Sequence, residues 1–303
     1  MPTVRERIRG SMPALITPFR NGEVDEAAFR KLVNWQIAEG SHGLVPVGTT
    51  GESPTLSHEE HKQVIELCIK AANKRVPVIA GAGSNSTAEA IDFSRHAKKV
   101  GADAVLHSTG YYNKPTQEGL YRHFKAISEA VDIPIFVYNV PVRTIVDIQV
   151  PTLARCAQLN NVVGVKDATA NVGRVTQQRL ACGKHFVQMS GEDGTVLGFM
   201  AHGGHGCISV SSNVAPRLCS EFQNACLNGD WKTALALQDR LMPLHDVLFV
   251  ETNPGPVKYA AWRLGIIGSP ECRLPLAPVS DQTKKSIDEV LARVGLLQAK
   301  AAE

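Results

Sequence analysis

A lysine stands where an apolar run of this chain stops, a place where α/β proteins keep their reactive groups. The run Val-Val-Gly-Val at 162–165 ends directly on Lys166. In a barrel or an open α/β sheet, catalytic residues lie at the carboxyl ends of the strands. Burial there disfavours the ammonium form, so we expect an amine that can condense with a carbonyl compound. A lysine that reaches from a strand into water is the plainer interpretation, so the other strand ends must decide.

Two other runs end on groups that could bind an acid and move protons. The sequence Gly-Thr-Thr-Gly-Glu at 48–52 offers the Thr49 and Thr50 hydroxyls, with glycines that permit a tight turn around a small anion. A run at 134–138 ends on Tyr138, whose hydroxyl could relay protons, and Arg143 follows as a bidentate carboxylate binder. Together these residues predict Schiff-base chemistry on a 2-oxo acid.

No metal or cofactor set competes with that chemistry. His58 and His61 lack the spacing of a zinc-binding HEXXH helix, and His202 and His205 flank glycines. The adjacent tyrosines at 111–112 are typical of loop packing or an interface. We therefore expect an enzyme without metal or cofactor.

The elements that must position these residues recur regularly along the chain. Eight short apolar runs start about 20 to 33 residues apart, which is the size of one βα unit, at 14–16, 44–47, 77–80, 104–106, 134–138, 162–165, 186–189 and 207–209. Runs that are apolar throughout indicate parallel strands buried on both faces. Helical patterns separate them, and two begin with predicted capping boxes, Ser57 with Glu60 and Ser86 with Glu89.

The sequence therefore predicts an α/β protein, a (β/α)8 TIM barrel with a C-terminal helical domain. We place the barrel at 1–229 and the helical domain at 230–303. Within the latter, helical patterns at 230–246, 256–264 and 280–297 are interrupted by Asn-Pro-Gly-Pro at 253–256. A doubly wound sheet is the weaker alternative, because no GxGxxG follows the first run.

Composition excludes several classes of protein. The 303 residues carry a net charge of +3 without a dense basic run, which argues against nucleic-acid binding. No window has the length and apolarity of a membrane span, and the first residues do not form a signal peptide. Seven cysteines form no CxxC pair, so we expect reduced thiols in a cytoplasmic protein.

Five motifs carry a resemblance to a known family. They are GTTGES at 48–53, YYNKPTQEGLY at 111–121, YNVPxRT at 138–144, GVKDAT at 164–169 and SGEDG at 190–194. From about residue 11 to 297, their order and spacing resemble the dihydrodipicolinate synthases, within the wider pyruvate-dependent family that includes N-acetylneuraminate lyase. The resemblance implies condensation of pyruvate with L-aspartate 4-semialdehyde to 4-hydroxy-tetrahydrodipicolinate, the first committed step of diaminopimelate and lysine biosynthesis.

The resemblance also implies catalytic roles. Lys166 would form the imine with pyruvate, and the hydroxyl relay would consist of Tyr138, Thr49 and Tyr112. In the family the residue matching Tyr112 comes from the neighbouring subunit, which implies a homotetramer built as a dimer of dimers.

Four further residues would bind the substrates. Thr50, with Thr49, would hold the pyruvate carboxylate, and Gly191 and Ile208 would line the pocket through their backbones. Arg143 would receive the carboxylate of aspartate semialdehyde.

Feedback inhibition by L-lysine is a further implication of the resemblance. The family's inhibited members use residues that match Ser53, His58, His61, Asn85, Glu89 and Tyr111, and all six residue types are present. Glu89 would supply the carboxylate for the ammonium group. If Glu89 also completed the helix cap of Ser86, one carboxylate would have to serve two partners.

Three alternatives remain open from the residues. A related pyruvate aldolase could act on a sugar acid or another aldehyde, although Arg143 argues against it. A catalytically silent barrel is suggested by residues 107–110, which read His-Ser-Thr-Gly where the family has aliphatic residues and then Thr-Pro. Glycine lacks the fixed φ of proline, so the following tyrosines would be aimed less precisely. A phosphate-binding barrel lacks supporting basic residues after the late strands.

Overall fold

A curled parallel sheet forms the centre of the molecule, in a computed structural model that describes residues 4–297. Its seven strands follow the order β1-β9-β8-β7-β6-β5-β4, and all neighbours are parallel. They are β1 (Gly10–Pro13), β4 (Ile79–Gly81), β5 (Ala104–Ser108), β6 (Ile135–Asn139), β7 (Val162–Asp167), β8 (Val187–Ser190) and β9 (Gly206–Ser209).

The segment at 44–47 connects the two edges of this sheet without forming a regular strand. Leu15 donates its N–H to the carbonyl of Val45 at 2.9 Å, and Ile79 donates to the carbonyl of Leu44 at 2.9 Å. The predicted strand stops there because Pro46 has no N–H to donate and Val47 has a φ of +57°.

The first strand also differs from its prediction. It covers Gly10–Pro13, and the expected run at 14–16 follows it as irregular chain. The reason lies at Ile16, whose N–H is donated to the side chain of Asn213 at 3.0 Å. A two-stranded hairpin of β2 (Phe19–Arg20) and β3 (Glu23–Val24) was missed, because two residues per strand leave no pattern.

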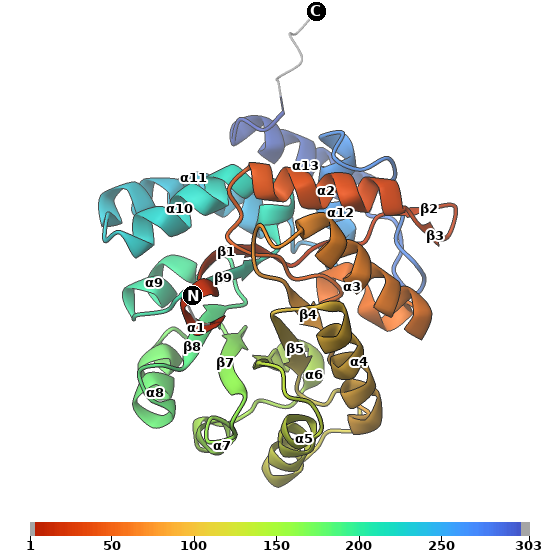
Figure 1. Ribbon diagram of the computed structural model, residues 1–303. Helices are drawn as coiled ribbons and strands as arrows, with labels where there is room; N and C mark the ends of the chain where they lie inside the picture. Colours follow the sequence, from red (N-terminus) through yellow and green to blue (C-terminus); the bar gives the residue numbers. More distant parts are fainter. Residues whose placement is uncertain (1–3, 298–303) are drawn as a thin grey trace, which may run out of the picture.

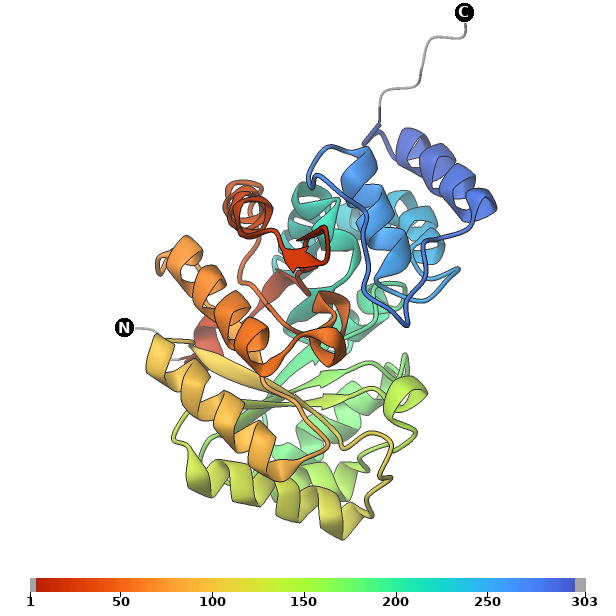
Figure 2. The ribbon, with the colours of Figure 1, turned by 90° about the vertical axis from the view of Figure 1, so that its right-hand side faces the viewer.

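Helices cover the outside of the sheet (Figures 1 and 2). They are the short α1 (Val4–Arg7) and α6 (Pro141–Thr144), and then α2 (Glu26–Ala38), α3 (His58–Ala72), α4 (Thr87–Val100), α5 (Gln117–Ala130), α7 (Val150–Cys156), α8 (Gly173–Cys182), α9 (Val196–Ala201) and α10 (Pro216–Leu227). The capping box of Ser57 and Glu60 is present. At α4 the prediction was half wrong, because Ser86 accepts from the N–H of Glu89 while the Glu89 carboxylate bonds elsewhere.

The apolar core has an inner and an outer part, and β6 shows how one strand serves both. Phe136 and Tyr138 belong to the inner cluster enclosed by the sheet, whereas Ile135 and Val137 belong to the outer cluster beneath the helices. Side chains that alternate along a strand point to opposite faces. The strand is therefore buried on both sides, as its continuous apolar run predicts.

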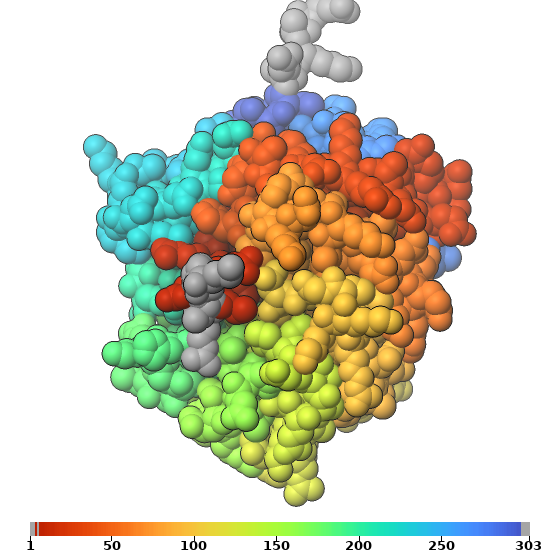
Figure 3. All heavy atoms as spheres, in the orientation of Figure 1, coloured from red at the N-terminus to blue at the C-terminus, as the bar shows by residue number. Residues whose placement is uncertain are grey.

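Three helices end the described chain: α11 (Trp231–Val247), α12 (Gly255–Arg263) and α13 (Asp281–Arg293). At the surface they lie beside the first helices of the chain (Figure 3). A salt bridge of 2.6 Å joins Lys258 of α12 to Glu52, and both side chains are fully buried. Within residues 4–297, no helix combines the length and apolarity that crossing a membrane requires. All seven cysteines fall in this range and are free thiols.

Candidate active site

The predicted nucleophile lies beside the predicted proton-relay tyrosine. Lys166 and Tyr138 are register partners on β7 and β6. The Nζ atom of Lys166 is 4.1 Å from the centroid of the Tyr138 ring. The lysine is only 6% exposed. This contact with the ring face restricts the direction of a side chain that would otherwise be flexible.

A glycine on the next strand end makes room for that lysine. A Cβ atom on Gly191 would lie 2.9 Å from Cε of Lys166 and 2.8 Å from Cβ of Ala168. Any larger residue would therefore displace the amine. Ile208, on β9, is buried in the same inner cluster as Tyr138. Four predicted pocket residues thus come from the ends of neighbouring strands or the loop after one.

Polar residues behind the two strand ends hold them in place. Asn139 and Asp167 directly follow the tyrosine and the lysine, and they too are register partners. Arg174 of α8 donates to Asp167 at 2.9 Å and pairs with Asp147 at 3.4 Å. Asn139 donates to the same Asp147 at 2.7 Å. This network, buried except at Asp147, joins both strand ends and restricts how their side chains point.

The loop with the two threonines is held from the C-terminal part of the chain. Two short 3-10 turns, η1 (Thr49–Gly51) and η2 (Ser53–Thr55), meet at Glu52, whose φ is +57°. The Glu52 carboxylate accepts from Lys258 at 2.6 Å and from the backbone N–H of Arg273 at 2.9 Å. Both oxygens of this buried carboxylate are thereby paired, which stabilises the unusual backbone conformation.

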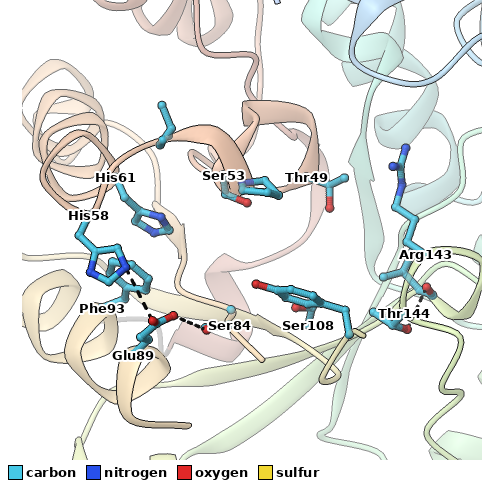
Figure 4. A pocket seen from close by; sticks show the side chains of 15 residues that line it. Thr49, Ser53, His58, His61, Ser84, Glu89, Phe93, Ser108, Arg143 and Thr144 are labelled. Atoms are coloured by element: carbon cyan, nitrogen blue, oxygen red, sulfur yellow. Dashed lines mark hydrogen bonds and ion pairs between the residues drawn. The ribbon is translucent and has the colours of Figure 1, made fainter. Parts of the chain in front are cut away.

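A cavity of about 340 Å³ opens beside this loop (Figure 4). Thr49, Ser53 and Tyr111 line it, with Arg143 and Thr144 on one side and Glu89, His58 and His61 on the other. In Figure 4, Arg143 and Glu89 lie at opposite sides, so a cationic and an anionic group face one space. Lys166, Tyr138, Thr50, Gly191 and Ile208 do not line this cavity.

At the Glu89 end, two residues without a predicted role, Ser84 and Phe93, contact the predicted ones. Ser84 donates its hydroxyl to the Glu89 carboxylate at 2.7 Å, and Nε2 of His58 lies 3.9 Å from it. His61 stacks on Phe93 with ring centroids 3.9 Å apart. Burial lowers the pKa of His61 to about 4, although its Nε2 bonds the Gly81 carbonyl. That bond makes Nε2 the donor of the neutral ring and leaves Nδ1 as an acceptor.

The paired tyrosines point in different directions. Tyr111 lines the cavity, and its carbonyl accepts from Asn85 at 3.3 Å, which brings the sixth predicted lysine-site residue to the edge of the group. Tyr112 is 95% exposed and has a φ of +66°. Its hydroxyl is therefore directed away from the pocket of its own chain.

The unusual residue before those tyrosines is accommodated in the core. His107 is fully buried on β5, and its Nε2 lies 3.0 Å from the Ser94 hydroxyl. Burial lowers its pKa to about 3. The side chain is thus a neutral core histidine, and the strand continues through Ser108. Within residues 4–297, no three His, Cys, Asp or Glu side chains are grouped to hold a metal ion.

Comparison with known proteins identifies the family of the chain. Residues 7–294 match the model of the dihydrodipicolinate synthetase family. The chain belongs to this family. The 4-hydroxy-tetrahydrodipicolinate synthase of Parvibaculum lavamentivorans is 65% identical over 289 residues, covering 95% of this chain and 99% of the relative. That of Afipia carboxidovorans is 62% identical over 295 residues, covering 97% and 99%.

Solved structures of family members have the same fold. The chloride-inhibited dihydrodipicolinate synthase of Acinetobacter baumannii, complexed with pyruvate, gives a TM-score of 0.93 at 46% identity and covers 96% of this chain and 100% of its own. The enzyme of Cyanidioschyzon merolae, solved with lysine bound, gives 0.92 at 33% identity and covers 98% and 100%. The family predicted from the five motifs is confirmed.

Proposed function

We propose that this chain condenses pyruvate with L-aspartate 4-semialdehyde to 4-hydroxy-tetrahydrodipicolinate through an imine on Lys166. Relatives of 62–65% identity over nearly the whole chain are named as this synthase. The activity predicted from the motifs, that of a lyase of this family, is thereby confirmed. The observation that carries the residue assignment is the buried amine 4.1 Å above the Tyr138 ring.

The first half of the reaction uses the strand ends. Nζ of Lys166 attacks C2 of pyruvate, and the carbonyl oxygen leaves as water after receiving protons. Tyr138 and Thr49 would pass those protons, because hydroxyl groups both donate and accept. Thr50 would bind the pyruvate carboxylate while the Gly191 and Ile208 backbones line the pocket. Loss of a proton from the methyl group then gives the enamine.

The second half joins the aldehyde. The enamine carbon attacks the aldehyde of aspartate semialdehyde, whose carboxylate Arg143 would hold, and the new alkoxide takes up a proton. The amino group of the adduct then attacks the imine carbon, which closes the ring and releases Nζ of Lys166. The position of Arg143 at one end of the cavity supports this role. Among the alternatives, a sugar-acid aldolase has less need of that guanidinium. A silent barrel is disfavoured by the buried, oriented lysine.

A second copy of the chain would complete the relay. The 95% exposure of Tyr112 supports a hydroxyl lent to the neighbouring subunit within a homotetramer, a dimer of dimers. We also propose that the sheet closes as a (β/α)8 barrel through the segment at 44–47, and that the predicted C-terminal domain is helical from residue 230 to residue 297. Its last predicted residues, 298–303, lie outside the described residues. The hydrogen bonds of Val45 and Leu44 to both sheet edges support closure. A cytoplasmic location stays a prediction.

L-Lysine is proposed as a feedback inhibitor that binds at the Glu89 end of the cavity. Five of the six predicted residues line that cavity, and the sixth, Asn85, bonds to Tyr111. The Glu89 carboxylate is free of the helix cap, so the expected conflict between two partners does not arise. A family member solved with lysine bound supports the proposal.

Borohydride reduction in the presence of pyruvate tests the chemistry directly. One reduced pyruvyl group per chain, mapped by mass spectrometry to the peptide of Lys166, is the expected result. Turnover with aspartate semialdehyde, compared with pyruvate release from N-acetylneuraminate, then distinguishes the synthase from a sugar-acid aldolase.

A further inference from the structure

A residue between the C-terminal helices contacts both proposed carboxylate-binding groups. Asn253 lies between α11 and α12 and is 5% exposed. Its Nδ2 donates to the hydroxyl oxygen of Thr50 at 3.0 Å. Its backbone carbonyl accepts from Nη2 of Arg143 at 3.3 Å. Asn253, about 200 positions further along the chain than Thr50, therefore contacts both the residue proposed to bind pyruvate and the residue proposed to bind aspartate semialdehyde.

The side-chain contact sets the direction of a hydroxyl hydrogen. A threonine hydroxyl has one hydrogen to donate and two lone pairs that accept. An amide N–H that occupies a lone pair leaves the hydrogen free for another acceptor. A carboxylate can only accept, so it binds Thr50 well when that hydrogen points toward it.

In this orientation the amide oxygen of Asn253, Oδ1, is buried and has no hydrogen-bond partner among residues 4–297. An unpaired buried acceptor is unfavourable. The donation from Nδ2 to Thr50 is thus the one hydrogen bond that this side chain makes within residues 4–297.

We propose that Asn253 is a positioning residue, which directs the Thr50 hydroxyl hydrogen toward the carboxylate of the 2-oxo acid. Its backbone carbonyl accepts from Nη2 of Arg143 and leaves the other N–H groups of the guanidinium for the carboxylate of aspartate semialdehyde. This inference rests on the proposed function, because it assigns Thr50 to pyruvate. It extends the site into the segment that the sequence analysis treated as an interruption between helices.

An isosteric change reverses the hydrogen bond. In Asn253→Asp, the carboxylate accepts from Thr50 and turns the hydroxyl hydrogen away from the ligand. The pyruvate concentration for half-maximal borohydride trapping should rise about tenfold or more, given that hydrogen bonds to charged groups contribute about 1.5–3 kcal/mol. Asn253→Ala, which leaves the hydroxyl undirected, should show a smaller rise.

A double-mutant cycle separates this effect from charge repulsion. In the Thr50→Val background no hydroxyl remains, so Asn253→Asp retains only the repulsion between two carboxylates. We expect its effect on half-saturation to shrink severalfold there, and Asn253→Ala to have no further effect. Equal effects in both backgrounds would overturn the proposal, as would an Asn253→Asp variant with wild-type half-saturation.

A matched control separates positioning from general destabilisation. Asn161 is a buried amide before β7 that donates to the carbonyls of Val131 and Ile133. Asn161→Ala should lower the melting temperature and leave half-saturation by pyruvate unchanged. A rise as large as that of Asn253→Ala would show that any lost buried amide has this effect, and would overturn the proposal. Should Asn253→Ala not fold, the isosteric Asn253→Asp in both backgrounds decides.

The two proposals fail in different ways. Trapping needs only pyruvate and borohydride, so it does not depend on the aldehyde substrate. A wild-type chain that traps no pyruvate refutes the proposed function. A wild-type chain that traps pyruvate on Lys166, with Asn253 variants that behave like the control, refutes only the role of Asn253.

Discussion

The end of β6 and β7 and the loop around Tyr112 are opposite in construction. Lys166 is 6% exposed, with its amine over the Tyr138 ring and a polar network behind both strands. Tyr112 is 95% exposed, in a loop where Lys114 also has a positive φ. The first region is organised within one chain. The second presents a tyrosine outward, so the proposed relay would need a second subunit, whereas the proposed nucleophile would not.

The largest effect is expected at the strand ends. Lys166→Arg should lose nearly all activity, because a guanidinium stays protonated and cannot attack a carbonyl. The variant should keep its fold, since arginine can retain the contact with the Tyr138 ring. Turnover measures the loss of activity, and intact mass after borohydride treatment measures the loss of the pyruvyl adduct. Circular dichroism checks that the fold is kept. A pyruvyl adduct on another lysine would disprove the assignment.

The loop gives the next largest effect. Tyr112→Phe keeps the ring and removes the hydroxyl, and loss of a general acid–base group lowers kcat about 10²- to 10⁴-fold. Oligomer size, measured by analytical ultracentrifugation, should not change. Unchanged turnover would reduce Tyr112 to interface packing, and the contrast between the two regions would then have no catalytic meaning.

Loss of the Arg143 side chain should affect the KM of one substrate more than that of the other. Loss of a charged bidentate contact removes about 1.5–3 kcal/mol of binding, which is about ten- to a hundredfold. Arg143→Ala should therefore raise KM for aspartate semialdehyde more than KM for pyruvate, measured by steady-state kinetics. Equal increases would make Arg143 a general structural element of the pocket.

Acid should destabilise the folded chain through two buried histidines, His61 and His107. The folded-state pKa values of His61 and His107, about 4 and about 3, lie below the unfolded value of 6.5 because of burial. Between pH 6.5 and 4 the unfolded chain therefore binds protons that the folded chain excludes. Stability should fall with falling pH by about 1.4 kcal/mol per pH unit for each histidine.

Denaturant unfolding at several pH values measures that slope. His107→Leu should make it shallower, because one buried titrating ring is removed. His185→Gln, at an exposed position, serves as the control and should leave it unchanged. A His107→Leu variant with the wild-type slope would contradict the attribution.

Inhibition by lysine is the smallest effect and concerns the cavity between the two regions. His61 is neutral, buried and close to the proposed ammonium site. His61→Lys would place a positive charge beside the ammonium group of the bound L-lysine and repel it. The lysine concentration for half inhibition should therefore rise about tenfold. Inhibition curves at fixed substrate measure this. A wild-type enzyme indifferent to millimolar lysine would refute the site.

The sequence predicted the residues that depend on local pattern. Apolar runs placed Tyr138 and Lys166 at strand ends because continuous burial is visible in consecutive residues. The pattern failed at 44–47, where Pro46 and Val47 interrupt bonding that apolarity alone would favour. It also misjudged Glu89, because a capping motif cannot show that Ser84 will attract the carboxylate instead.

Residues joined only by the fold left no signal. Asn253 was visible as a turn residue, and nothing near it in sequence indicated contact with Thr50. The same holds for Lys258, which would ordinarily be expected on a solvated helix face. Such contacts follow from the docking of α12 against a loop formed much earlier in the chain.

The ion pair of Lys258 and Glu52 joins residues 206 positions apart. During synthesis the Glu52 carboxylate leaves the ribosome long before its partner exists, and burying it alone would be strongly unfavourable. We therefore expect the threonine loop to become ordered only once α12 has been made. A chain that ends before α12 should lack an ordered threonine loop, because the Glu52 carboxylate then has no buried cation to pair with.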